Sequence, residues 1–236
     1  MIINMQKLKT SLYPHENQFV QDAYDGLVTD ILSCDPVPKT LCVTSNAPGA
    51  GKTTISINLA ISYVMTGRSA LLIDADIRKS PKYKRLSVNT FLGLSDFLTE
   101  SRELKDITTL TNMSKLAIIT SGMATAKNPL GMLYSPKFEF LMQAATEKFD
   151  LVIIDTSSLD VNADSSVIAV RTDATLLVVE INDSATALER NIVRLDSMGA
   201  NIIGTVLNKI PKGEYKTHME FYNYKHKGFK GRRARR

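Results

Sequence analysis

A glycine-rich stretch that ends in lysine and threonine has the residue types needed to bind the phosphates of a nucleotide. It reads Gly49-Ala50-Gly51-Lys52-Thr53-Thr54 and follows a short apolar run. Small residues let backbone N–H groups approach phosphate oxygens, and the amino end of a following helix adds a positive dipole end. The Lys52 ammonium would reach the β- and γ-phosphates of ATP, and the Thr53 hydroxyl would bind Mg²⁺. A glycine-rich turn that only starts a helix is the alternative, and the general pattern has Gly where this chain has Asn46.

Three carboxylates follow apolar runs that resemble buried strands. Asp74 and Asp76 are two residues apart after one run, so their side chains share a face, and Asp155 follows another. The carboxyl ends of parallel strands are where open α/β sheets bind ligands. Neighbouring carboxylates there suit Mg²⁺, and Asp74 or Asp76 could also accept a proton from a hydroxyl. Asp155 has the Walker B position, which holds Mg²⁺ directly or through water. Solvated turns and helix caps are the simpler interpretations of all three.

Two further polar residues are weaker candidates. Asp164 could lie near the same edge of the sheet, or it could only cap the helix that follows it. Asn208 comes directly after an apolar run and could bind the edge of an adenine through its amide. A turn-forming role is the alternative for Asn208.

Alternating strands and helices must position these residues. Short apolar runs predict strands over residues 40–45, 70–74, 116–120, 151–154, 174–179 and 202–207. Helical spacing of apolar residues predicts helices over residues 16–33, 52–65, 137–148 and 185–198. This order indicates an α/β fold, a doubly wound and mainly parallel sheet with helices on both faces.

Composition favours one folded domain with a basic tail. The chain has 236 residues, of which 44% are hydrophobic and 22% charged. We expect a single domain over residues 1–211 and a flexible tail over 212–236. From Lys209 to Arg236 there are ten Lys and Arg against two Asp and Glu, so the tail should attract an anionic partner such as a membrane surface. A merely solvated end is the alternative.

The sequence also indicates a compartment. No apolar run approaches the roughly 18–20 residues that cross a bilayer, and the first residues lack the apolar segment of a signal peptide. Two cysteines, Cys34 and Cys42, offer no disulfide framework. We therefore expect a cytoplasmic protein.

Taken in order, these motifs resemble those of the bacterial tyrosine kinases of capsule and exopolysaccharide assembly. That family belongs to the deviant-Walker P-loop ATPases, which include chromosome-partition and septum-site ATPases. The matching stretches are 44–53, Asp74 with Asp76 and Arg78, 93–98, Ser121-Gly122, Asn128-Pro129, Leu133 with Ser135, Asp155 and 204–209. They span about residues 16–211.

The resemblance implies a protein-tyrosine autokinase that regulates polysaccharide synthesis and export with ATP and Mg²⁺ as cofactors. Its acceptors would be tyrosines of the tail, here Tyr215, Tyr222 and Tyr224. It also implies self-association as a ring or dimer and a separate membrane-anchored activator, a polysaccharide co-polymerase subunit. The chain would then lie at the inner face of the plasma membrane through that partner, and no nucleic-acid partner is expected.

The resemblance also implies roles for single residues. Asp74 looks like the base for the tyrosine hydroxyl, and Asp76 and Asp155 look like the carboxylates that organise Mg²⁺ with Thr53. Asn208 would contact adenine. The phosphates would be bound by Gly49, Ala50, Gly51, Lys52, Thr53 and Thr54. Arg78 would lie beside the acceptor and steady phosphate charge.

Two other functions fit parts of the sequence. A positioning ATPase normally carries an additional lysine where this chain has Ala47, which disfavours that class. A nucleotide-binding scaffold that has lost kinase activity is the second. It is favoured by Asp25 and Val28, which replace the arginines usual in the first helix of the family, and by the sparse tail tyrosines.

Overall fold

The computed structural model of the chain describes residues 18–78, 92–124 and 127–211. The candidate acceptors Tyr215, Tyr222 and Tyr224, the tail over 212–236 and the start of the expected first helix lie outside these residues. The domain boundary at 211 therefore stays a prediction.

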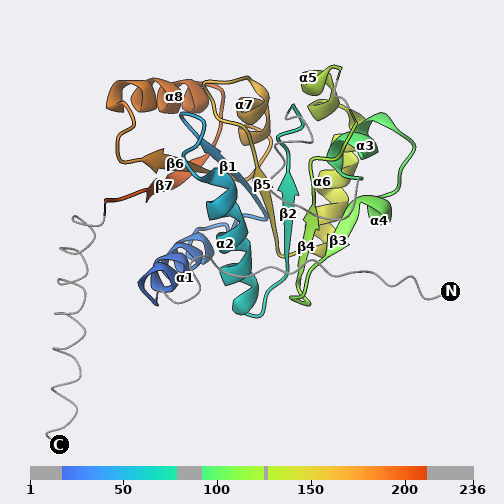
Figure 1. Ribbon diagram of the computed structural model, residues 1–236, viewed down its shortest axis with the longest axis horizontal. Helices are drawn as coiled ribbons and strands as arrows, with labels where there is room; N and C mark the ends of the chain where they lie inside the picture. Colours follow the sequence, from blue (N-terminus) through green and yellow to red (C-terminus); the bar gives the residue numbers. More distant parts are fainter. Residues whose placement is uncertain (1–17, 79–91, 125–126, 212–236) are drawn as a thin grey trace, which may run out of the picture.

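Seven strands form one sheet in the order β3-β4-β2-β5-β1-β6-β7 (Figure 1). Every neighbouring pair is parallel except β3 and β4, which are antiparallel. The strands are β1 Thr40–Ser45, β2 Ala70–Asp74, β3 Thr108–Leu110, β4 Leu116–Ile119, β5 Leu151–Asp155, β6 Ala174–Glu180 and β7 Ile202–Asn208.

Helices cover both faces of this sheet (Figure 1). Helices α1 and α2 share one hydrophobic core with one face, and α3, α6, α7 and α8 contribute to the core on the other face. The helices are α1 Gln18–Leu32, α2 Lys52–Met65, α3 Leu94–Thr99, α4 Leu104–Ile107, α5 Pro129–Leu133, α6 Pro136–Lys148, α7 Asp164–Ala169 and α8 Ala185–Ser197.

The strands β2 and β5 are apolar up to their final aspartate because both of their faces are buried. Along β2, Leu71 and Ile73 join the core beneath α3 and α6, whereas Ala70 and Leu72 join the core beneath α1 and α2. A strand buried on both faces favours apolar side chains at successive positions, which explains the continuous apolar runs. The predicted fold class is confirmed, and all six predicted strands are present within a residue or two of their expected ends.

The antiparallel edge strand β3 was not predicted. Its three residues, Thr108 to Leu110, are too few to show a hydrophobic period, and its pairing with β4 is a tertiary contact. The short helices α3, α4 and α5 were likewise absent from the sequence prediction, and α7 entered it only as the helix that Asp164 could cap.

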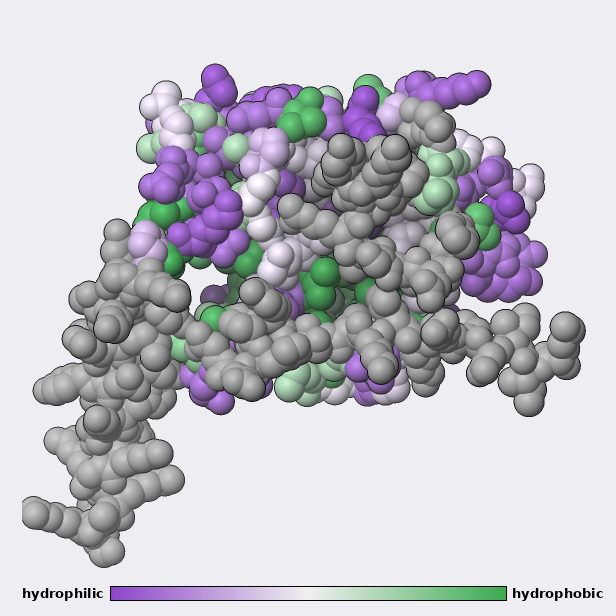
Figure 2. Space-filling view, in the orientation of Figure 1, coloured by the Kyte–Doolittle hydropathy of each residue, from purple (hydrophilic) through white to green (hydrophobic). Residues whose placement is uncertain are grey.

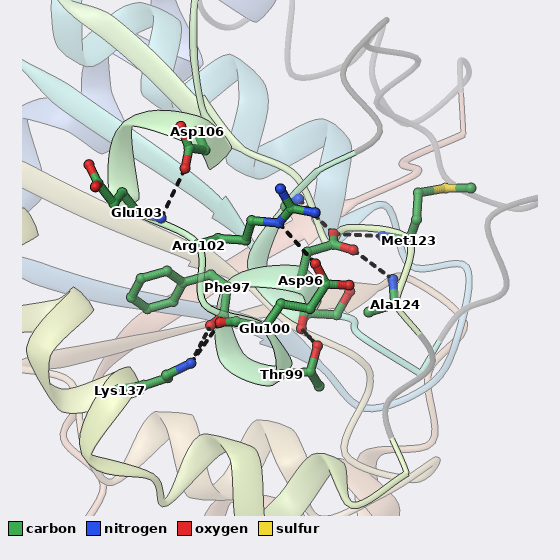
Figure 3. Close-up of polar contacts among 12 residues, drawn as sticks. Asp96, Phe97, Thr99, Glu100, Arg102, Glu103, Asp106, Met123, Ala124 and Lys137 are labelled. Carbon is green, nitrogen blue, oxygen red and sulfur yellow. Dashed lines mark hydrogen bonds and ion pairs between the residues drawn. The ribbon is translucent and has the colours of Figure 1, made fainter.

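Helix α3 is fastened at both ends (Figure 3). At its start, the buried Asp96 carboxylate accepts hydrogen bonds from the backbone N–H groups of Gly93, Met123 and Ala124, at 2.8–3.0 Å. At its end, the Lys137 ammonium of α6 donates to the Phe97 carbonyl of the helix and to the carbonyl of Glu100, the residue that follows it. The carboxylate therefore joins α3 to the loop that follows β4, next to the carboxyl end of β2.

Gly122 packs against Asp96 and Ser95, so we expect its substitution to have a large effect on stability. Its φ of 82° lies in the left-handed region, and a Cβ placed on it would overlap the Asp96 carboxylate and the Ser95 hydroxyl. We expect Gly122→Ala to destabilise the fold by about 2–4 kcal/mol, since both strain and overpacking add. Gly199→Ala is the matched control because its φ of 87° is similar but no atom lies near the new Cβ. Equal shifts of the two variants in urea denaturation would contradict the packing argument.

None of the helices within the described ranges combines the length and apolar character needed to cross a bilayer. Figure 2 shows hydrophilic and hydrophobic side chains intermixed over the visible described surface.

Candidate active site

The glycine-rich loop lies where the sequence predicts, between the end of β1 and the start of α2 (Figure 1). Gly49 and Gly51 have φ angles of 88° and 98°, a conformation that a side chain would strain. The loop therefore requires glycine at both positions. Its backbone leads directly into the amino end of α2, a favourable place for phosphate.

Lys52, the first residue of α2, is buried and folds back over the loop. Its ammonium donates to the Ser45 hydroxyl at 2.8 Å, and that hydroxyl donates to the Ala47 carbonyl at 2.8 Å. The end of β1 thus helps to orient the lysine whose charge would contact phosphate.

Asn208, at the end of β7, also contacts the glycine-rich loop. Its amide donates to the Ala50 carbonyl at 2.7 Å, and a Cβ on Gly51 would overlap that amide. Close approach of Asn208 is thus a second reason for glycine at position 51. The predicted contact of Asn208 with adenine stays a prediction.

Asp155 is the most buried of the three candidate carboxylates. Its oxygens accept hydrogen bonds from the Thr53 hydroxyl at 2.6 Å and from the Ser56 hydroxyl at 3.2 Å. Asp74 lies directly opposite Asp155 on the neighbouring strand, and its carboxylate accepts the backbone N–H of Asp76 at 3.1 Å. Burial, with the nearby Asp74 charge, raises the pKa of Asp155 to about 7.

This raised pKa predicts how the stability of the metal-free protein depends on pH. Because the folded state binds a proton at Asp155 that the unfolded state releases near pH 4, stability falls as pH rises from about 4 to about 7. Relative to Asp155→Asn, the natural protein should lose about 1.4 kcal/mol per pH unit in that window. Denaturant titrations in EDTA at several pH values measure this difference, and a pH-independent difference would contradict the assignment.

Arg78 and Asp164 form a two-point ion pair. The Nε and Nη2 groups of Arg78 donate to the two oxygens of Asp164 at 2.5 and 2.8 Å. Asp164 is buried, and Ala163 occupies the N-cap position of helix α7 without a side-chain capping bond. The interpretation of Asp164 as only a helix cap is therefore wrong, since its carboxylate binds Arg78.

A cavity of about 330 Å³ opens at this edge of the sheet. It is lined by Pro48, Gly49, Gly51, Lys52, Thr53, Asp76, Arg78, Ser157, Ser158, Val161 and Asn162. The structure thus gathers six of the candidate residues around one cavity. Asp155 lies behind Thr53, and Asp74 lies beside Asp155 on the neighbouring strand. Thr54 is exposed on the first turn of α2.

Outside the phosphate loop, four lining residues were not predicted: Ser157, Ser158, Val161 and Asn162. All four belong to the loop after β5. Their position just beyond a predicted parallel strand, where ligands bind, was the sequence feature that could have identified them as lining residues.

The donor set fits Mg²⁺ with a nucleotide. Within the described ranges no three Asp, Glu, His or Cys side chains converge as a ready-made metal cage. Mg²⁺ needs no such cage, because it is usually held by one or two carboxylates together with waters and phosphate oxygens. Thr53 and Asp155, already in contact, with Asp76 on the cavity wall, supply such a set.

A buried amide braces the loop from helix α8. The Asn191 amide donates to the Asn46 side-chain oxygen and to the Asp160 carboxylate, the latter at 3.1 Å. The Asp160 N–H in turn donates to the Asn46 carbonyl at 3.1 Å. Asn46, which replaces the usual glycine, thus links the phosphate loop to α8 and to the loop after β5.

Removing this brace should loosen nucleotide binding. Asn191→Ala leaves the buried Asn46 side-chain oxygen without its donor, at a cost of about 1–3 kcal/mol. We expect Mg·ADP affinity to fall severalfold, as measured by calorimetry. Asn201→Ala removes an exposed amide bond, to the Asp173 carbonyl near the amino ends of β6 and β7, and should leave affinity unchanged. Equal affinities of Asn191→Ala and the natural chain would show that the brace does not order the loop.

Comparison with known proteins identifies the family of the chain. A family model described as an AAA domain matches residues 38–195. The tyrosine-protein kinase CpsD of Streptococcus pneumoniae serotype 4 is 32% identical over 192 residues, which cover 80% of this chain and 84% of that protein. The chain belongs to the bacterial tyrosine-kinase family.

Solved structures of the family have the same fold. The kinase domain of the Escherichia coli tyrosine kinase Etk superimposes with a TM-score of 0.77 at 25% identity, covering 89% of this chain and 84% of that one. The chimerical protein CapA2B2 gives a TM-score of 0.78 at 27% identity, covering 88% and 94%. Septum-site MinD of Pyrococcus horikoshii, with a TM-score of 0.60 at 20% identity, shares the fold. The family predicted from the motifs is confirmed.

Proposed function

We propose that this member of the tyrosine-kinase family transfers the γ-phosphate of Mg·ATP to tyrosines of its own C-terminal tail. The observation that supports this most is that Lys52, Thr53, Asp76 and Arg78 all line one cavity, where Thr53 also contacts Asp155. One edge of the sheet thus offers phosphate donors, carboxylates for a divalent ion and a second cation.

The chemistry asks the protein for positioning and for charge stabilisation rather than for covalent steps. Lys52 and the loop N–H groups would bind the phosphates. Thr53, Asp76 and Asp155 would hold Mg²⁺, which when bound neutralises phosphate charge. Asp74 would accept the proton of the tyrosine hydroxyl, whose pKa near 10 makes it a weak nucleophile without a base.

Tyr215, Tyr222 and Tyr224 are the proposed acceptors. They lie outside the described residues, and their proposal rests on the family resemblance and on their place in the basic tail. The same resemblance supports a membrane-anchored activator subunit, self-association, a peripheral location at the inner face of the plasma membrane and a role in polysaccharide export. The basic tail should add salt-dependent attraction to anionic lipid.

Mass mapping after incubation with Mg·ATP tests the proposal. The chain is incubated with and without the cytoplasmic segment of its membrane partner, beside a variant with all three tail tyrosines changed to Phe. We expect phosphotyrosine in the natural chain and loss of most of it in the variant. Undiminished phosphotyrosine in the variant would move the acceptors elsewhere. No transfer in either arm, although Mg·ATP binds, would favour a scaffold.

A further inference from the structure

Asp164 offers a fixed anionic support for the arginine at the mouth of the cavity. The Asp164 side chain is about 4% exposed, whereas the Arg78 side chain is about 42% exposed. Their two parallel hydrogen bonds match the planar guanidinium fork to the planar carboxylate. A buried anion thus anchors one side of a partly exposed cation.

The loop after β5 fixes the position of Asp164. The backbone N–H of Asp164 donates to the Asn162 side-chain oxygen at 3.0 Å, and the Ser157 hydroxyl donates to the same oxygen at 2.8 Å. Ser157 and Asn162 both line the cavity. The start of α7 is therefore set by the cavity wall itself.

This anchoring leaves much of the guanidinium available for a ligand. A guanidinium has five N–H donors, and Asp164 takes two of them. The remaining donors belong to a side chain that lines the cavity together with Lys52 and Thr53. A long arginine side chain loses up to about 2 kcal/mol of rotamer entropy when it is ordered, so an arginine already held in place loses less on binding.

The nearby Asp76 carboxylate explains why the ion pair between Arg78 and Asp164 matters. The hydrogen bonds to Asp164 are the main cause that raises the pKa of the Arg78 guanidinium, and the Asp76 charge acts on it in the same direction. Without Asp164, the Asp76 carboxylate would be the competing partner for Arg78. Pairing with Asp76 would withdraw the cation from phosphate and occupy a carboxylate proposed to hold Mg²⁺.

We propose that Asp164 is a positioning residue for phosphotransfer, which holds Arg78 so that its remaining N–H groups face the phosphoryl group in transit. This inference rests on the proposed kinase function. It assigns Asp164 a role that acts entirely through Arg78, with no contact to the substrate required.

A double-mutant cycle tests the role. The variants are Asp164→Asn, Arg78→Ala and the double variant, each assayed for kcat, Mg·ADP affinity and melting temperature. We expect Asp164→Asn to lower kcat about tenfold or more, with Mg·ADP affinity unchanged within about twofold, because ADP lacks the γ-phosphate. Since the two residues act as a unit, Asp164→Asn should cost less than about twofold in the Arg78→Ala background.

Two further variants keep the test decisive. Asp164→Glu retains the charge and should therefore retain more activity than Asp164→Asn. This variant keeps the test informative if Asp164→Asn folds poorly. Asp96→Asn alters an equally buried carboxylate away from the cavity, so it should lower the melting temperature and leave the kcat of the folded protein intact.

The outcomes separate this inference from the proposed function. Losses that multiply in the double variant, or a fall in Mg·ADP affinity equal to the fall in kcat, would overturn the role of Asp164. An impaired Arg78→Ala variant beside a fully active Asp164→Asn variant would also overturn it while leaving the kinase intact. A natural chain that binds Mg·ATP but phosphorylates no tyrosine would instead refute the kinase function.

Discussion

Replacing Lys52 by methionine is expected to lower the rate of tyrosine phosphorylation by at least about 10²–10³-fold. The lysine is buried at the amino end of α2, and its ammonium is oriented by Ser45 toward the loop that would bind phosphate. Removing one preorganised donor to developing charge typically costs a factor of this size. Methionine keeps the length and apolar stem of the side chain, so the fold should survive.

Quantitative phosphotyrosine measurement with the partner's cytoplasmic segment present gives the rate. Lys115→Met is a matched control, because Lys115 is exposed and donates to the Gly67 carbonyl near the amino end of β2. That control should retain full activity. Phosphotyrosine at the natural level in Lys52→Met would exclude this cavity as the catalytic site.

Replacing Asp74 by asparagine is expected to separate nucleotide binding from transfer. The asparagine oxygen can still accept the Asp76 N–H that the carboxylate accepts at 3.1 Å, so the turn after β2 should keep its shape. The amide cannot take a proton from tyrosine, and loss of a general base typically costs about 10²–10⁴-fold. Binding of Mg·ADP should change little.

Single-turnover transfer and Mg·ADP affinity, measured on the same preparation, distinguish the two effects. Asp183→Asn is the control. The Asp183 carboxylate accepts the backbone N–H of Glu180, the last residue of the parallel strand β6, and Asp183 does not line the cavity. Full transfer by Asp74→Asn would remove Asp74 from the role of base. A parallel loss of nucleotide affinity would instead show that Asp74 acts in binding.

Local patterns in the sequence were sufficient for six of the seven strands of the sheet and for the phosphate loop. Strands such as β5 are buried on both faces, so their apolar runs are visible without knowledge of their neighbours. The positive φ angles at Gly49 and Gly51 explain why glycine occurs there, so the motif could be read directly.

Partners far apart in the chain could not be predicted in the same way. Asn46 and Asn191 are 145 positions apart, and Arg78 and Asp164 are 86 apart. The members of each pair are brought together when α8 or α7 packs against the sheet. The sequence around Asn191 or Asp164 therefore does not indicate which residue it contacts. The bond from Asn208 to the Ala50 carbonyl is of the same kind.

A crystal structure of the chain with Mg²⁺ and a non-hydrolysable ATP analogue would show whether this cavity binds the nucleotide. We expect the terminal phosphate beside Lys52 in the cavity of about 330 Å³, with the ion between Thr53 and Asp155. A second cavity of about 290 Å³, lined in part by Tyr63 and Arg68, lies at the amino ends of the strands. A nucleotide bound there instead, or a phosphate loop left empty at saturating analogue, would contradict the account.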